Sequence, residues 1–304
     1  MPSLISVHEL HHRLTDPYLR IVDARWRGDG SGRAMYAAGH IPGAVHLDWH
    51  SDLNHTRGGV RDLLLPPAEF AAVMAAAGIG DDTRVVAYAD GDYSGAARVW
   101  WGLRYYGHEH VTVLDGGLDR WRAEGLPLET EPATVARAVF TPRPQRQWLA
   151  TAAEVEQAVR DGDPSVALVD TRPREQYLGQ AVWTPPGSRY LDPSQPAIDI
   201  GARGPVRGGH IPSAIHLNSS ENLDPHTWIY LPPEALAARA QAAGVRPEQR
   251  IITYCGVGIS ASLGLFALHL AGYRNLALYD ASWEEWGSDP SKPIERGEGH
   301  ARPV

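Results

Sequence analysis

A single cysteine stands in the 304-residue chain, in the stretch "RIITYCGVGISASLGLFALHL" at residues 250–270. An apolar strand is expected before Cys255, a short loop after it, and an apolar helix beginning near Ser260, which is expected to cap it. Gly256 and Gly258 permit positive φ angles and leave backbone N–H groups uncovered. Successive N–H groups at a helix N-terminus bind anions. The sequence of this loop therefore predicts that Cys255 is a thiolate nucleophile, or that the loop binds a negatively charged sulfur added to that thiol.

A buried structural thiol and a phosphate-binding nucleophile are the alternatives for Cys255. A free cysteine at a strand end can be a buried small apolar side chain, but the strand–Cys–Gly–x–Gly–x–Ser–helix context favours a reactive thiol. A cysteine-dependent phosphatase needs an arginine six residues after the cysteine, and Ala261 stands there. The phosphate-binding loop GxxxxGK[ST] is absent. These features argue against phosphoryl chemistry.

The composition indicates a globular protein that acts on small molecules. The chain is 43% hydrophobic and 21% charged, and its net charge of −8 argues against nucleic acid or an anionic membrane as the main partner. One cysteine excludes an internal disulfide or a multi-cysteine zinc site, and the 14 histidines are scattered, so no metal is expected. The N-terminus lacks signal-peptide features and no stretch resembles a membrane span, so we expect a cytoplasmic protein.

The chain repeats itself, because five blocks recur in the same order in its two halves. The pairs are "LRIVDARW" (19–26) with "ALVDTRPR" (167–174), "AAGHIPGAVHL" (37–47) with "RGGHIPSAIHL" (207–217), "LPPAEFAAVMAAAGI" (65–79) with "LPPEALAARAQAAGV" (231–245), "RVVAYAD" (84–90) with "RIITYCG" (250–256), and "GHEHVTVLDGGLDRW" (107–121) with "GYRNLALYDASWEEW" (272–286). Such an ordered series predicts two homologous domains.

Each repeat alternates short β-branched strands with helical patterns. This order predicts an α/β fold in which each domain is a mainly parallel sheet flanked by helices. Ligands of such sheets sit at the carboxyl ends of the strands, where Cys255 is expected. The Pro-containing stretch at 131–150 has no clear periodicity, so we expect an N-terminal domain at 1–135, a linker at 136–150 and a C-terminal domain at 151–304.

The chain resembles a tandem-domain rhodanese over nearly its whole length. The resemblance is carried by the doubled "GHIP" (39–42 and 209–212), the Asp-ended strands, the loop "CGVGIS" (255–260) and "LDGGLDRW" (114–121). Such proteins are sulfurtransferases of the thiosulfate or 3-mercaptopyruvate type. The resemblance implies that Cys255 takes a sulfane sulfur from an anionic donor as a persulfide. Cyanide, a thiol or a thioredoxin-like protein then accepts the sulfur, without metal or organic cofactor. Either Ala89 or Asp90 matches Cys255, so the first domain is expected to be catalytically silent.

The resemblance also implies the residues that hold the sulfur and the donor. The loop N–H groups would hold the outer sulfur, and nearby arginines would hold the anionic donor. The candidate loop residues are Gly256, Val257, Gly258, Ile259 and Ser260, and the candidate arginines are Arg172, Arg174, Arg189, Arg203 and Arg207. Arg174 is the preferred one, because the Asp–x–Arg pattern of Arg172 also occurs in the first domain and is explained there as a support of the fold.

The donor is left open between two compounds. Thiosulfate users of the family tend to carry basic residues directly after the cysteine, whereas the loop here is uncharged and leans toward 3-mercaptopyruvate. Val257 stands where that type has a hydroxyl, and Gln176 stands where the family often has an arginine. A non-catalytic rhodanese-fold interaction module with a redox-sensing thiol is the alternative function. His40 and His210 recur in both repeats and are therefore interpreted as structural.

Overall fold

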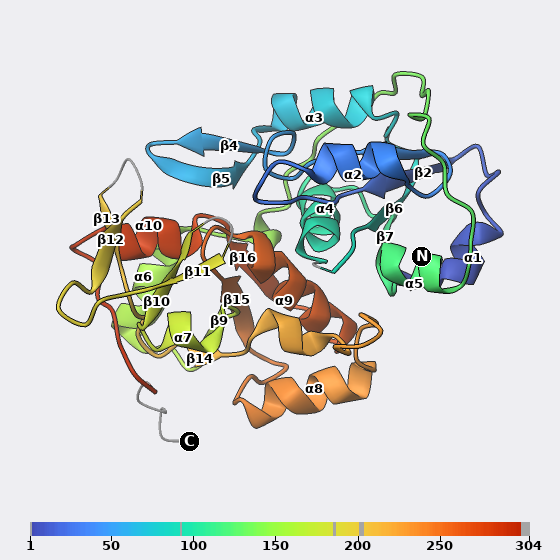
Figure 1. Cartoon of the computed structure of the whole chain (residues 1–304). Helices are drawn as coiled ribbons and strands as arrows, with labels where there is room; N and C mark the ends of the chain where they lie inside the picture. The colour runs from blue at the N-terminus through green and yellow to red at the C-terminus, as the bar shows by residue number, and fades with distance from the viewer. Residues whose placement is uncertain (1, 92, 185–186, 201–203, 299–304) are drawn as a thin grey trace. The chain divides into compact units, whose positions relative to one another are not determined.

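The computed structural model describes residues 2–91, 93–184, 187–200 and 204–298. The chain divides into two compact units (Figure 1). Unit 1 comprises residues 1–55, 64–145 and 223–231, and unit 2 comprises residues 56–63, 146–222 and 232–304. The main division, after residue 145, falls inside the expected linker at 136–150. Each unit also contains a short segment from the other half of the sequence, which the repeat pattern alone does not indicate.

Unit 1 is built on a parallel sheet with the strand order β1-β7-β6-β2-β3. The strands of this sheet are β1 (Leu4–Ile5), β2 (Leu19–Asp23), β3 (Ala44–His46), β6 (Arg84–Tyr88) and β7 (Val111–Leu114). The helices of the first repeat are α1 (Val7–His11), α2 (Gly32–Ala38), α3 (Pro67–Ala76), α4 (Ser94–Tyr105) and α5 (Gly117–Ala123). A separate hairpin, β4 (Asn54–Arg57) with β5 (Val60–Leu64), spans the boundary between the two groups of residues.

Unit 2 repeats this topology with the strand order β8-β16-β15-β9-β14, again all parallel. Its sheet contains β8 (Leu149–Ala150), β9 (Val166–Asp170), β14 (Ile215–His216), β15 (Arg250–Tyr254) and β16 (Leu276–Tyr279). Its helices are α6 (Ala152–Asp161), α7 (Arg174–Tyr177), α8 (Pro233–Ala242), α9 (Ile259–Leu270) and α10 (Ser282–Ser288), with 3₁₀ turns η1 (Arg146–Trp148) and η2 (Ser219–Asn222). Two hairpins are added, β10 (Ala181–Thr184) with β11 (Gly187–Tyr190) and β12 (Ala197–Asp199) with β13 (Pro205–Arg207).

The predicted α/β fold with two homologous domains is thus confirmed. Strands β9 and β15 read "VALVD" and "RIITY", and their buried β-branched residues suit a sheet covered by helices. Helix α9 packs against β15, β16 and α8, as Figure 1 shows for the red and orange part of the chain. Among the residues that the structure describes, no helix has both the length and the apolarity to span a bilayer.

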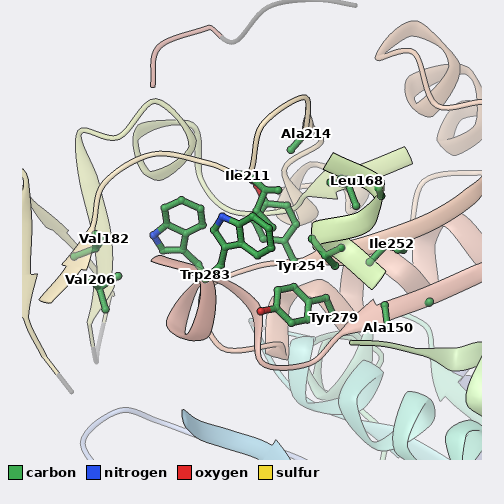
Figure 2. Packing of buried hydrophobic residues seen from close by; sticks show 14 residues of the cluster. Ala150, Leu168, Val182, Val206, Ile211, Ala214, Ile252, Tyr254, Tyr279 and Trp283 are labelled. Carbon is green, nitrogen blue, oxygen red and sulfur yellow. Dashed lines mark hydrogen bonds between the residues drawn. The ribbon is translucent and has the colours of Figure 1, made fainter. Parts of the chain in front are cut away.

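The core of unit 2 reaches the carboxyl ends of its strands. A cluster of buried side chains joins Leu168 and Ile252 in the sheet with Trp283 and Trp286 of α10 (Figure 2). Tyr254, the last residue of β15, belongs to the same cluster and is fully buried. The residue that follows Tyr254 is therefore fixed against a close-packed interior, where side chains have little freedom to move.

Candidate active site

Cys255 lies between the end of β15 and the start of α9, and only 2% of its surface is exposed. Helix α9 begins at Ile259, and Gly258 at φ 83° forms its N-cap. The prediction of Ser260 as the cap is wrong, because this serine lies within the first helical turn. A left-handed residue ends the loop, and glycine takes that conformation without a steric penalty.

The backbone N–H groups that follow Cys255 are available to a ligand. Among the residues that the structure describes, no protein acceptor takes a hydrogen bond from the N–H groups of residues 256–260. They stand at the N-terminal end of the 12-residue helix α9, where the helix dipole adds partial positive charge. Unsatisfied donors beside a sulfur atom favour an anion at this position.

The start of α10 holds the loop from the opposite side. The Cys255 N–H donates to Ser282 Oγ at 3.1 Å, and the same hydroxyl donates to the Tyr279 carbonyl at 2.8 Å. The N–H groups of Trp283 and Glu284 donate to the carbonyls of Cys255 and Gly256 at 2.9 Å and 2.8 Å. The carbonyls are thereby occupied, while the donors of the loop remain free for a ligand.

Close contacts explain the glycines of the loop. A Cβ atom on Gly258 would lie 2.4 Å from the Asp280 carbonyl oxygen, which real structures do not tolerate. A Cβ atom on Gly256 would lie 3.1 Å from Cβ of Trp183 in β10. The backbone of the loop is thus enclosed on two sides, and larger residues would push it away from the position of the sulfur.

Arg172 is buried beside this loop rather than open to solvent. Its Nε and Nη2 donate to the Asp170 carboxylate at 2.9 Å and 2.5 Å, and Nη2 also donates to the Gly209 carbonyl. Burial alone would lower the pKa of Arg172, but the Asp170 carboxylate outweighs it and the pKa is raised, so the guanidinium stays charged. The guanidinium carbon lies 4.5 Å from the ring centre of Trp283.

The other candidate arginines occupy different places in unit 2. Arg174 begins α7 and forms an exposed ion pair with Glu298. An anionic ligand can replace Glu298 at little cost in free energy, because an exposed ion pair is weak. Arg189 is exposed on β11. Arg207 ends β13 and donates to the carbonyls of Gly287, Asp289 and Lys292. Arg203 lies outside the described residues. The roles of these arginines in holding a donor stay predictions.

Gln176 stands at the position where the resemblance leads one to expect an arginine, and its side chain is buried, with 2% of the residue exposed. Its amide nitrogen donates to Ser188 Oγ at 2.8 Å, and its amide oxygen is buried without a partner among the described residues. Because the amide of Gln176 is uncharged, position 176 supplies no positive charge beside the hairpin β10–β11.

Unit 1 keeps the frame of the site without its thiol. The Leu118 N–H donates to the Ala89 carbonyl, as the Trp283 N–H donates to that of Cys255. Ala89 therefore holds the backbone position of Cys255, which decides between the two residues that the sequence left open. A methyl group cannot carry sulfur, which supports the prediction that this repeat is catalytically silent.

The two histidines of the GHIP motifs have matching surroundings. His40 and His210 are fully buried, and each bonds through Nδ1 to a carbonyl at 2.8 Å, of Tyr36 and Tyr177 respectively. Each stacks on the ring of that tyrosine, with centroids 3.9 Å and 3.8 Å apart. A group that is built alike in the repeat with Ala89 and in the repeat with Cys255 is best explained as structural. No group of three potential metal-ligating side chains occurs among the described residues.

Residues that sequence reasoning missed are Ser282, Glu284 and Arg61. Arg61 belongs to the segment 56–63 of unit 2, and its guanidinium binds the Glu284 carboxylate at 2.8 Å and 2.9 Å. The sequence carries one indication for Ser282, because it aligns with Gly117 in the repeated block. In the structure both residues have positive φ, at 49° for Ser282 and 47° for Gly117. No local pattern connects Arg61 with Glu284.

Comparison with known proteins supports the resemblance. The Rhodanese-like domain family matches residues 6–124 and 151–289. The chain is 35% identical over 303 residues to a probable 3-mercaptopyruvate sulfurtransferase from Pseudomonas aeruginosa, covering 97% of this chain and 99% of that protein. It is 34% identical to a putative thiosulfate sulfurtransferase, SseB, from Mycobacterium tuberculosis, covering 93% and 92%.

A solved structure agrees with these sequence matches. The crystal structure of SseA from Escherichia coli, a 3-mercaptopyruvate sulfotransferase, superposes with a TM-score of 0.77 at 27% identity, covering 93% of this chain and 99% of that one. The chain therefore belongs to the rhodanese family. Within that family it is a two-domain sulfurtransferase, and the predicted enzyme class is confirmed.

Proposed function

We propose that the protein transfers a sulfane sulfur from 3-mercaptopyruvate to a small thiophilic acceptor through a persulfide on Cys255. The observation that supports this most directly is the row of N–H groups at residues 256–260, which directly follow the thiol, lead into the start of α9 and have no acceptor among the described residues. Such donors stabilise both a thiolate and the terminal sulfur of a persulfide.

The first half-reaction is a nucleophilic attack on sulfur. The Cys255 thiolate attacks the sulfur of 3-mercaptopyruvate, an S–S bond forms, and the C–S bond of the donor breaks. The electron pair of that bond leaves as the enolate of pyruvate, which takes a proton. The enzyme is left as Cys–S–SH, held by the loop donors.

The second half-reaction restores the thiolate. Cyanide or a thiolate attacks the outer sulfur, the S–S bond breaks, and its electron pair returns to Cys255. With cyanide the product is thiocyanate. The two half-reactions share no substrate, so ping-pong kinetics are expected.

The preference for 3-mercaptopyruvate is argued from the charges around the loop. The side chains of residues 256–260 are uncharged, and Gln176 is neutral. Arg174 is the candidate for binding the donor carboxylate, because its present partner Glu298 is exposed. Thiosulfate, a dianion, would need more fixed positive charge than these residues supply.

Mass spectrometry tests the proposal most directly. The purified protein is incubated with 3-mercaptopyruvate, freed of donor and weighed, and a gain of 32 Da that cyanide removes as thiocyanate is expected. Cys255→Ser is the control and should show no gain. Loading by thiosulfate alone would assign the other donor. Loading by neither compound would contradict the proposal and favour a binding module with a redox-sensing thiol.

A further inference from the structure

The two Asp–x–Arg motifs that stand at equivalent strand ends of the repeats, Asp23–Arg25 and Asp170–Arg172, are built alike. Arg25 donates through Nε and Nη2 to Asp23, at 2.9 Å and 2.6 Å, and through Nη2 to the Gly39 carbonyl. Arg172 makes the same contacts with Asp170 and Gly209. In both arginines the remaining guanidinium nitrogen, Nη1, is buried and has no hydrogen bond among the described residues.

In unit 1, Nη1 of Arg25 faces a carboxylate. Arg25 Nη1 lies 3.7 Å from the Asp90 carboxylate, which also binds Arg27. Asp90 directly follows Ala89, the residue that holds the backbone position of Cys255. An anionic group at the strand end is therefore paired with this guanidinium in the repeat that lacks the thiol.

Unit 2 supplies no carboxylate directly after the strand end. Residues 256–258 read Gly-Val-Gly, and the group at the strand end is the Cys255 thiol itself. The guanidinium carbon of Arg172 lies 4.5 Å from the centre of the Trp283 ring, and the backbone N–H of Trp283 donates to the Cys255 carbonyl, so Trp283 contacts both residues. The negative charge of an ionised Cys255 also contributes to the raised pKa of Arg172.

We propose that Nη1 of Arg172 holds the anionic sulfur of Cys255, in the thiolate and in the persulfide, so that this fold-supporting residue also sets the reactivity of the nucleophile. It is a fixed cation at the sulfur rather than a ligand of the donor. The inference rests on the proposed function for its role in transfer, but reactivity of the thiol can be measured without any sulfur donor.

Other ionisable groups surround the same position and must be kept constant. Asp280 has an oxygen 2.8 Å from the place of a Cβ on Gly258, and Glu284 is bound by Arg61. Tyr254 is coupled to Asp170, and burial raises its pKa well above the usual value, so it stays neutral. The charge of Arg172 lowers the pKa of Tyr254, so the variant at position 172 must keep a positive charge, and all measurements are made at one pH.

The test compares Arg172→Lys with Arg25→Lys, its counterpart in unit 1. Lysine can still pair with Asp170 but has no second nitrogen for the sulfur. At pH 7 and without donor, we expect Arg172→Lys to slow alkylation of Cys255 by iodoacetamide about three- to tenfold, because the ammonium that pairs with Asp170 no longer contacts the sulfur. Arg25→Lys should stay within about twofold, with a comparable loss of melting temperature. Equal alkylation rates in the two variants would overturn the proposal.

A measurement on the unaltered protein covers the case in which Arg172→Lys does not fold. The ¹³Cζ resonance of Arg172 is followed by NMR while iodoacetamide converts the thiol to a neutral thioether. We expect the Arg172 signal to shift and the Arg25 signal to stay. An unmoved Arg172 signal contradicts the inference, whether or not the protein transfers sulfur.

Discussion

Arg61 and Glu284 are 223 residues apart in the sequence and form a two-point ion pair in unit 2. The Glu284 side chain is 6% exposed, and its backbone N–H donates to the Gly256 carbonyl. The Glu284 carboxylate is also the first cause of the raised pKa of Arg61. A residue of the β4–β5 hairpin is thus connected to the cysteine loop through a single intermediate, Glu284.

Removal of Arg61 should therefore weaken both stability and turnover. Arg61→Ala leaves the Glu284 carboxylate nearly buried without its partner, and we expect a loss of about 1–2 kcal/mol, less than for a fully buried pair because Arg61 is 31% exposed. We also expect kcat/KM for sulfur transfer to fall about three- to tenfold. Arg57→Ala, at an exposed arginine of the same hairpin, is the control and should change stability by less than about 0.5 kcal/mol. Urea unfolding and initial rates measure both effects, and equal behaviour of the two variants would show that the pair is unimportant.

Ser282 supports Cys255 through one hydrogen bond in a strained backbone conformation. Ser282→Ala removes the acceptor of the buried Cys255 N–H and keeps φ near 49°, so we expect a loss of about 1–3 kcal/mol. Ser282→Gly removes the same acceptor but relieves the positive φ, as Gly117 does in unit 1. The glycine variant should be the more stable of the two by chemical denaturation. A glycine variant less stable than the alanine variant would argue against backbone strain at this position.

Gly258 combines a positive φ with a steric contact, and the chain contains a matched control. In Gly258→Ala the new Cβ meets the Asp280 carbonyl, whereas Gly272, at φ 95°, has nothing within 4 Å. We expect Gly272→Ala to cost about 1 kcal/mol for conformation alone and Gly258→Ala clearly more. Only Gly258→Ala should lose the 32 Da persulfide adduct, because Gly258 belongs to the loop that we propose holds the sulfur, whereas Gly272 follows the far end of α9. Melting curves and mass spectra of both variants decide the point.

Stability should decrease in mild acid because of buried histidine. Burial lowers the pKa of His210 below its ordinary 6.5, although the neighbouring Glu295 opposes the shift. Below about pH 6.5 the unfolded chain therefore binds a proton that the folded chain does not, and the free energy of unfolding falls as pH falls. One such group contributes up to about 1.4 kcal/mol per pH unit. His210→Asn should reduce this slope between pH 6.5 and 5 in urea titrations, and an unchanged slope would assign the effect elsewhere, for example to His108, whose pKa burial also lowers.

Much of this architecture was predictable because the repeat is written in local patterns. The strand before Cys255, the helix after it and the Asp-ended strands β2 and β9 all lie where periodicity and turn residues place them. The ion pair between Arg61 and Glu284 was not predictable. Arg61 is an ordinary arginine in a short hairpin, and nothing near it in the sequence indicates Glu284. Long-range pairs of this kind depend on the folded chain path rather than on local preference.

The exchange of segments between the units makes the duplication indivisible. Residues 56–63 group with the second half of the chain and residues 223–231 with the first. A cut after residue 145 would therefore yield two fragments, each deprived of a piece that packs with its own unit. The fragment with the cysteine would lose Arg61 and leave Glu284 unpaired. Each repeat thus supplies a segment of chain to the other unit, and neither unit can be obtained whole by a single cut.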